Sequence, residues 1–325
     1  MDLDALHVRR EDRRRAVRRR RRLAAALIAA MAVLAVAIVV LAAGSRSRSP
    51  SVSAGVHSSP AAANAKAHAG GSSAVTGNAG AGAGRPGAEP VPILMYHVIA
   101  APPPGAPFPG LYVTPSEFSA QMRALKDAGW HAVTLDQVAA NWKTGAPLGA
   151  GKPIVLTFDN GYQSQYTQAL PVLRGLGWVA DENMQLSGLP PSQGGLGPAE
   201  IRGLLAAGWE LDTQGFSHAD LISLDAAQLN YQVAVARGVL ERRYHVPVNW
   251  FCYPSGHYDA TVVAAVKAAG YAGSTTVVPG WAHRTDDPYR LHRLRVLGGT
   301  TPQGLLGLVA GTRDAPPAPT SYNGA

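Results

Sequence analysis

The feature that most constrains the fold is a regular alternation between residues 91 and 310. Apolar runs of strand length are followed by amphipathic stretches with helix start and stop signals, and seven or eight such units fill the segment. In the first unit VPILMYHVI is typical of a strand, and Thr114-Pro115-Ser116-Glu117 forms a capping box with proline at the first helical position. This pattern favours an α/β fold, a parallel (β/α)7-8 barrel with helices outside, over an open doubly wound sheet. No GxGxxG or GxxxxGK loop follows a predicted strand, which argues against nucleotide binding.

The net positive charge of the chain lies mainly in the residues before this segment. The net charge is +8, yet 91–310 holds 14 basic and 15 acidic residues, so the excess lies outside it, chiefly in the arginine run from Arg9 to Arg22. Such a run suits either a nucleic-acid arm or a flank that orients a membrane segment. The next residues, Leu23 to Ala43, are all uncharged, and a helix of that length spans a hydrocarbon core of about 30 Å. We therefore expect a membrane partner and no nucleic acid.

The N-terminal pattern predicts a single-pass cell-membrane protein with its N-terminus in the cytoplasm and its C-terminal domain extracytoplasmic. A cleavable signal peptide is the alternative, because Val40-Leu41-Ala42 could form a cleavage site, although its apolar region would be unusually long. The predicted organisation is a cytoplasmic Arg-rich segment (1–22), a transmembrane helix (23–44), a disordered Ala/Gly/Ser/Pro linker (45–90), the α/β domain (91–310) and a disordered tail (311–325).

Polar residues stand where several of the predicted strands end. They are His97, Asp159 with Asn160, Gln214 with the nearby His218, and Tyr253 with Pro254. Each alone has a structural explanation, such as capping a turn. In a barrel, however, the C-terminal ends of the strands meet on one face, where catalytic residues gather. Their coincidence therefore predicts one shared site.

Five motifs carry a resemblance to a known family: VPILMYHVI, LTFDNG, GWELDTQGFSHADL, WFCYPSGHYD and YRLHRLRV. In this order they resemble the polysaccharide deacetylase family, carbohydrate esterase family 4, over essentially all of Val91 to Val296. The resemblance implies a distorted (β/α) barrel that removes acetyl groups from N-acetylglucosamine-type sugars with one divalent metal, usually zinc. The implied partner is an N-acetylated polysaccharide of the cell wall or an exopolysaccharide.

The resemblance also implies roles for single residues. Asp159 matches the general base, and His97 matches a proton donor for the leaving amine. The metal ligands match Asn160, Gln214 and His218. The wall of the substrate groove matches Tyr253 and Pro254, with Trp281 as a further groove residue.

Departures from the family pattern fall on the metal site. The family's Asp, His, His trio is Asn160, Gln214, His218 here, and two neutral amides should weaken a zinc site. Amide oxygens suit hard ions such as Mg²⁺ or Ca²⁺ better, so a weakened site and no metal both stay open. Cys252 stands where many members have an arginine that steadies the base; as the lone cysteine in an apolar run, it is expected to be a packed thiol.

Three functions remain open from the sequence. The first is a deacetylase with a weak or unusual metal site. The second is a catalytically silent carbohydrate-binding domain, in which the amides hydrogen-bond to sugar hydroxyl and acetamido groups. The third is a metal-free glycoside hydrolase, in which Asp159 pairs with Glu182 or Glu210 at the carboxylate spacing that such enzymes need.

Overall fold

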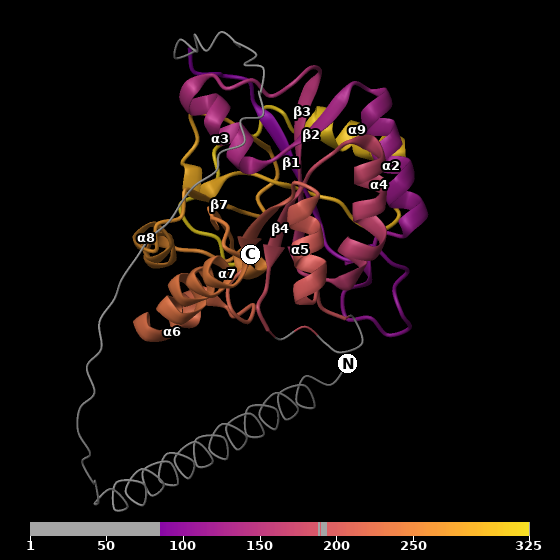
Figure 1. The fold of residues 1–325 in the computed structure, drawn as a ribbon. Helices are drawn as coiled ribbons and strands as arrows, with labels where there is room; N and C mark the ends of the chain where they lie inside the picture. The colour runs from indigo at the N-terminus through magenta and orange to yellow at the C-terminus, as the bar shows by residue number, and fades with distance from the viewer. Residues whose placement is uncertain (1–84, 188, 190–193, 325) are drawn as a thin grey trace, which may run out of the picture. The chain divides into compact units, whose positions relative to one another are not determined.

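The computed structural model describes residues 85–187, 189 and 194–324 (Figure 1). The predicted Arg-rich segment, the transmembrane helix and the linker up to residue 84 lie outside these ranges. Within them, no helix is both long enough and apolar enough to cross a membrane.

The described strands form one sheet. Their bounds are β1 (Val91–Tyr96), β2 (Trp130–Val133), β3 (Lys152–Asn160), β4 (Asp181–Met184), β5 (Glu210–Thr213), β6 (Trp250–Cys252), β7 (Gly273–Thr275), β8 (Trp281–Ala282) and β9 (Leu294–Arg295). Their order is β7-β6-β5-β4-β3-β1-β8, with β2 paired to β3 and β9 paired to β1.

Every paired strand is parallel to its neighbour except β8, which runs antiparallel to β1. The predicted α/β class with a parallel sheet is therefore confirmed. The sheet is a half-barrel, because the strands after β5 are only two or three residues long and the bridge between Thr275 and Leu291 is isolated. A regular barrel needs consistent strand pairing around the whole circle, which these short strands do not supply.

Helices follow most of the strands, and local signals set their ends. Their bounds are α2 (Pro115–Asp127), α3 (Leu135–Thr144), α4 (Leu170–Leu176), α5 (Pro198–Ala206), α6 (Ala226–Asn230), α7 (Ala236–Tyr244), α8 (Ala260–Ala268) and α9 (Pro302–Gly311). The predicted capping box at Thr114 and Glu117 is present, and α3 begins with a second one at Thr134 and ends at Gly145 in the left-handed region.

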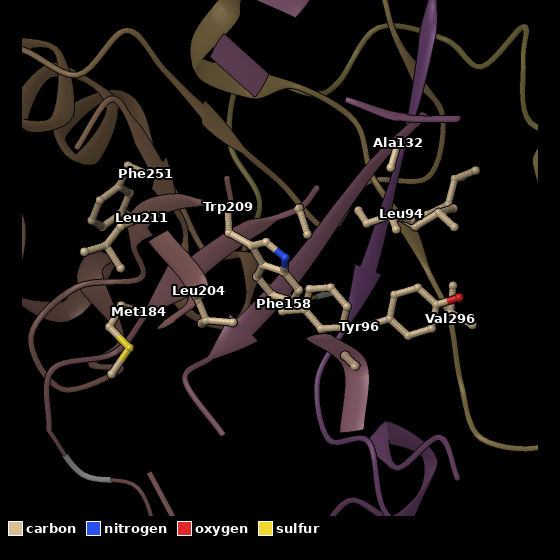
Figure 2. Packing of buried hydrophobic residues seen from close by; sticks show 14 of the residues in the cluster. Leu94, Tyr96, Ala132, Phe158, Met184, Leu204, Trp209, Leu211, Phe251 and Val296 are labelled. Carbon is tan, nitrogen blue, oxygen red and sulfur yellow. The ribbon is translucent and has the colours of Figure 1, made fainter. Parts of the chain in front are cut away.

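The register of the sheet separates an apolar face from a polar one. Phe158 points to the helix side, where its ring stacks on Tyr96 at 5.7 Å and on Trp209 at 5.0 Å between ring centroids (Figure 2). Side chains alternate along a strand, so Thr157 and Asp159 point to the inner face. There Asp159 pairs in register with Asn183 of β4. The same alternation that builds the core thus directs the predicted base inward.

Residues 311–324 lie against the domain, which differs from the disordered tail predicted for 311–325. The backbone of Tyr322 exchanges two hydrogen bonds with Tyr258, at 2.9 and 2.8 Å, and the Tyr258 hydroxyl donates to the carbonyl of Pro319 at 2.8 Å. His292 Nε2 lies 3.0 Å from the carbonyl of Pro316. Proline lacks an N–H but keeps a free carbonyl, so a Pro-rich segment without apolar periodicity can still be held along its length.

Candidate active site

One cavity of about 590 Å³ lies at the C-terminal ends of β1, β3 and β5. It is lined by Met95, His97, Pro107, Phe108, Leu111, Asp159, Asn160, Tyr162, Gln185, Leu189, Gln214, Ser217, His218, Tyr253, Ser255, Gly256, Val277 and Arg295. The structure thus brings six of the eight predicted site residues to one place, although their roles there remain predictions.

Pro254 and Trp281 are not among the residues that line this cavity. Pro254 is buried at the start of a short 3-10 turn, between two residues that do line it. Trp281 lies near the other end of the sheet, because β8 pairs with the beginning of β1, where Trp281 is opposite Pro92. Its indole N–H donates to the carbonyl of Val309 in α9 at 2.8 Å. The predicted groove role of Trp281 is therefore wrong. Trp281 lies on β8, an antiparallel strand that the repeating strand-helix pattern of the sequence did not indicate.

Asp159 is a buried carboxylate held by a bidentate ion pair. The Arg293 guanidinium donates to its two oxygens at 2.7 and 2.9 Å, and Asn183 Nδ2 donates to Oδ1 at 2.8 Å. Burial acts to raise the pKa of Asp159, but Arg293 with these hydrogen bonds outweighs it and lowers that pKa to about 2. Asp159 is therefore ionised at neutral pH, and both of its oxygens are engaged.

Arg293 is the site residue that the sequence did not indicate. It contacts Cys252, whose Sγ lies 3.1 Å from Arg293 Nη2 and 3.5 Å from Asp159 Oδ2. Arg293, from the segment before β9, thus places a guanidinium beside Cys252, the position at which the resemblance implies an arginine. The available signal was the motif YRLHRLRV, but nothing local shows which of its arginines points inward. Cys252 itself is fully buried, and burial raises the pKa of its thiol, as expected for a packed cysteine.

His97 lies beside the base, with Nε2 3.9 Å from Asp159 Oδ2. Burial lowers the pKa of His97 to about 4, and the nearby Asp159 only partly offsets this. Its imidazole is therefore neutral at neutral pH, and Nδ1 has no hydrogen-bond partner among the described residues. In the free domain His97 does not carry the extra proton that the predicted acid role would use.

A single buried glutamine braces the ends of the first and third strands. Gln165, in the π-helical turn Gln165–Ala169, donates from Nε2 to the carbonyls of His97 and Asp159 at 2.9 and 2.8 Å. One amide therefore links the backbone of His97 to that of Asp159. Such π-helical turns are frequent at functional sites.

The predicted metal ligands offer one imidazole and two amides. Asn160 donates from Nδ2 to Gln185 Oε1 at 3.0 Å, and Gln214 Oε1 has no partner among the described residues. Both oxygens are neutral, and the one carboxylate beside them, Asp159, is bound by Arg293. Zinc sites are built from Cys, His and carboxylate donors. The residues present do not fit a catalytic zinc ion.

The cavity also lacks the carboxylate pair of a glycoside hydrolase. Asp159 is the only acidic residue among the described residues that line it. Glu182 pairs in register with Phe158 and Leu211 on the helix side of the sheet, and Glu210 lines a different cavity. Because neither can face Asp159 across a bound sugar, the third function considered above is not supported.

Part of the sequence and the fold match known proteins. Residues 149–274, which include Asp159, Gln214 and Cys252, match the family model described as polysaccharide deacetylase. The family model thus supports a polysaccharide deacetylase domain over these residues. The chain is 29% identical over 209 residues to YxkH of Bacillus subtilis (strain 168), a polysaccharide deacetylase by name, over 64% of this chain and 72% of that protein.

Among solved structures, the chain is similar to the Streptococcus pyogenes deacetylase PplD in complex with acetate. The TM-score is 0.63 at 25% identity, covering 69% of this chain and 99% of that one. A shorter stretch of 68 residues is 38% identical to the poly-beta-1,6-N-acetyl-D-glucosamine N-deacetylase of Escherichia coli (strain K12). That match covers 21% of this chain and 10% of the E. coli protein.

Proposed function

We propose that the deacetylase domain binds an N-acetylated, N-acetylglucosamine-containing polysaccharide in the cavity at the strand ends. The observation that carries this proposal is the pair of unsatisfied polar atoms, His97 Nδ1 and Gln214 Oε1, on side chains that line the cavity. Buried polar atoms nearly always have a hydrogen-bond partner, so these two suit a ligand or water that enters from the cavity. An amide oxygen accepts from sugar hydroxyls and from an acetamido N–H.

The apolar lining supports a sugar ligand as well. Tyr162 and Tyr253 line the cavity, and so does Phe108, which is 67% exposed. Ligand sites commonly combine such apolar walls with a few polar groups that set orientation. The relatives named for acting on polysaccharides add support for this class of ligand.

Hydrolysis of the N-acetyl group is the second candidate. The ionised Asp159 at the position of the family base favours it, because a carboxylate beside a neutral imidazole could accept a proton from water. Against it, the donor set of Asn160, Gln214 and His218 does not fit zinc. Acetate release from N-acetylated oligosaccharides, measured with and without added Zn²⁺ or Co²⁺, separates an enzyme from a binding domain.

The binding proposal predicts the effect of Gln214→Ala. The full-length chain should bind N-acetylglucosamine oligomers in isothermal titration calorimetry, and the variant should bind them about fivefold more weakly, since one lost hydrogen bond costs about 1 kcal/mol. Gln163→Ala is the matched control, because Gln163 is exposed and does not line the cavity. Equal affinity of the two variants, or no binding by the parent chain, would count against the cavity as the site.

We also propose that the domain lies outside the cytoplasm, anchored by residues 23–44. Support comes from the arginine run followed by the long uncharged stretch. External protease added to intact cells or wall-free spheroplasts should then digest the domain. Full protection in spheroplasts that stay sealed would contradict this location.

A further inference from the structure

A second polar cluster lies on the inner face of the sheet, away from the cavity that holds Asp159. The carboxylates of Asp181, Glu210 and Asp212 each offer an oxygen within 4.8 Å of the others. Asp181 and Glu210 are the first residues of β4 and β5 and pair with each other in register. Alternation along β5 directs Asp212 to the same face. Three side chains on adjacent strands thus converge on one point.

The cluster is buried and brings three carboxyl groups together, and burial raises the pKa of Asp181 and Asp212. Asp181 and Asp212 are 0% and 1% exposed. No lysine, arginine or histidine forms an ion pair with any of the three in the part of the chain that the structure describes. Isolated buried carboxylates are strongly unfavourable unless they are paired, protonated or bound to a metal.

Backbone N–H groups satisfy only part of this cluster. Asp181 Oδ1 accepts from the N–H of Leu135, Glu210 accepts from that of Asp136, and Asp212 Oδ1 accepts from that of Trp250. The first two donors belong to the N-terminus of α3, whose dipole offsets about half a charge. Asp181 Oδ2 and Asp212 Oδ2 accept no hydrogen bond from an N–H donor among the described residues, and the Asp181 carboxyl lies within hydrogen-bond reach of the Glu210 carboxyl. Two buried oxygens without an N–H donor in one cluster suit a positively charged ligand.

The cluster has its own entry. A second cavity of about 240 Å³ is lined by Glu210 and Asp212, together with Asp136 and Asn249, and shares no described lining residue with the first. The Asp136 carboxylate is held by Asn249 Nδ2 at 2.7 Å and Trp250 Nε1 at 3.0 Å. An ion can therefore reach the cluster without passing the sugar cavity.

We propose that Asp181, Glu210 and Asp212 bind one hard divalent cation of the Ca²⁺ or Mn²⁺ type. Oxygen ligands lie about 2.3–2.6 Å from Ca²⁺, so oxygens on opposite sides of one ion are roughly 4.6–5.2 Å apart, which accommodates the observed spacing. Oxygen donors without sulfur or imidazole select such cations over zinc. The cation stabilises the starts of β4 and β5 against each other. The site does not depend on the proposed function of the sugar cavity.

The test uses the full-length chain, treated with EDTA and then titrated with Mn²⁺ or Ca²⁺. One equivalent of Mn²⁺ should bind in electron paramagnetic resonance titrations, Ca²⁺ should displace it, and the Tm should rise by about 5–10 °C at a hundredfold excess over Kd. Asp212→Asn should weaken Mn²⁺ binding at least about tenfold. Asp127→Asn, at the exposed last position of α2, is the matched control and should leave binding unchanged.

His218→Ala distinguishes the two cavities and should also keep the Mn²⁺ equivalent. If Asp212→Asn does not fold, Mn²⁺ binding by the wild-type chain, its competition by Ca²⁺ and its retention in His218→Ala still decide the matter. If the wild-type chain binds no Mn²⁺ up to about 1 mM, the weakest affinity of natural Ca²⁺ sites, the proposal is overturned. The three carboxyl groups would then share protons instead of holding a cation. Loss of the equivalent in His218→Ala overturns it as well.

Discussion

Arg293→Ala should lower the free energy of unfolding by about 3–5 kcal/mol, because it leaves the Asp159 carboxylate buried without its counter-charge. The variant also loses the hydrogen bonds from Arg293 to Thr157 Oγ1 at 2.9 Å and to the carbonyl of Thr276 at 2.8 Å. Urea denaturation of the full-length chain measures the change through the shift in midpoint at constant m-value. Arg293→Lys should recover only part of the loss, because an ammonium cannot donate to both carboxylate oxygens in the same fork geometry.

Arg295→Ala is the matched control. Arg295 is exposed two residues further on, so its removal should change stability by less than about 0.5 kcal/mol. The pH dependence adds a second check. With its pKa lowered to about 2, Asp159 contributes stability above its ordinary pKa near 4 that is lost as the pH falls toward 2. The deficit of Arg293→Ala should therefore shrink at low pH. A deficit no larger than that of Arg295→Ala would show that the ion pair contributes little.

Asn160→Asp combined with Gln214→His should raise zinc affinity by at least about 100-fold, because loss of even an outer partner of a metal ligand costs 10–100-fold. The double variant regains one anionic donor and one imidazole beside His218, the donor types that zinc prefers. The backbone can accept the first change: Asn160 has φ of 81°, and aspartate is among the few residues that tolerate this region. Gln185 would lose the donor from Asn160 but can turn its own amide to donate to the new carboxylate.

Zinc competition with a chromophoric chelator and acetate release from N-acetylated oligosaccharides are the two measurements. Acetate release by the double variant, with none by the natural chain, would identify the natural chain as a binding domain. Equal release by the natural chain under the same conditions would instead show that it is an active deacetylase. The single variants serve as controls, since each restores only one donor. Unchanged zinc affinity in the double variant would mean that these positions do not face a common ion.

Most of the fold and part of the site could be predicted from residue order. Strand-length apolar runs and the capping box at Thr114 are local signals, and they placed α2 and the parallel sheet. The position of a polar residue after a strand is also local information. It was enough to group His97, Asp159 and Gln214, because parallel strands bring their C-terminal ends to one edge whatever lies between them.

The remaining features depend on contacts between residues far apart in the chain. Arg293 reaches Asp159 across 134 positions because the half-barrel curves β9 back to β1, and no local pattern distinguishes it from Arg295. That side chains alternate between the two faces of a strand can be predicted from the sequence. Which residues of β4 face inward depends on how the strand sits in the sheet, and this places Asp181 on the inner face and Glu182 toward the helices. Residue order is therefore enough to predict the elements and the edge where polar groups meet. Which charges are paired follows from the folded chain, because ion pairing depends on distances that curvature and register set.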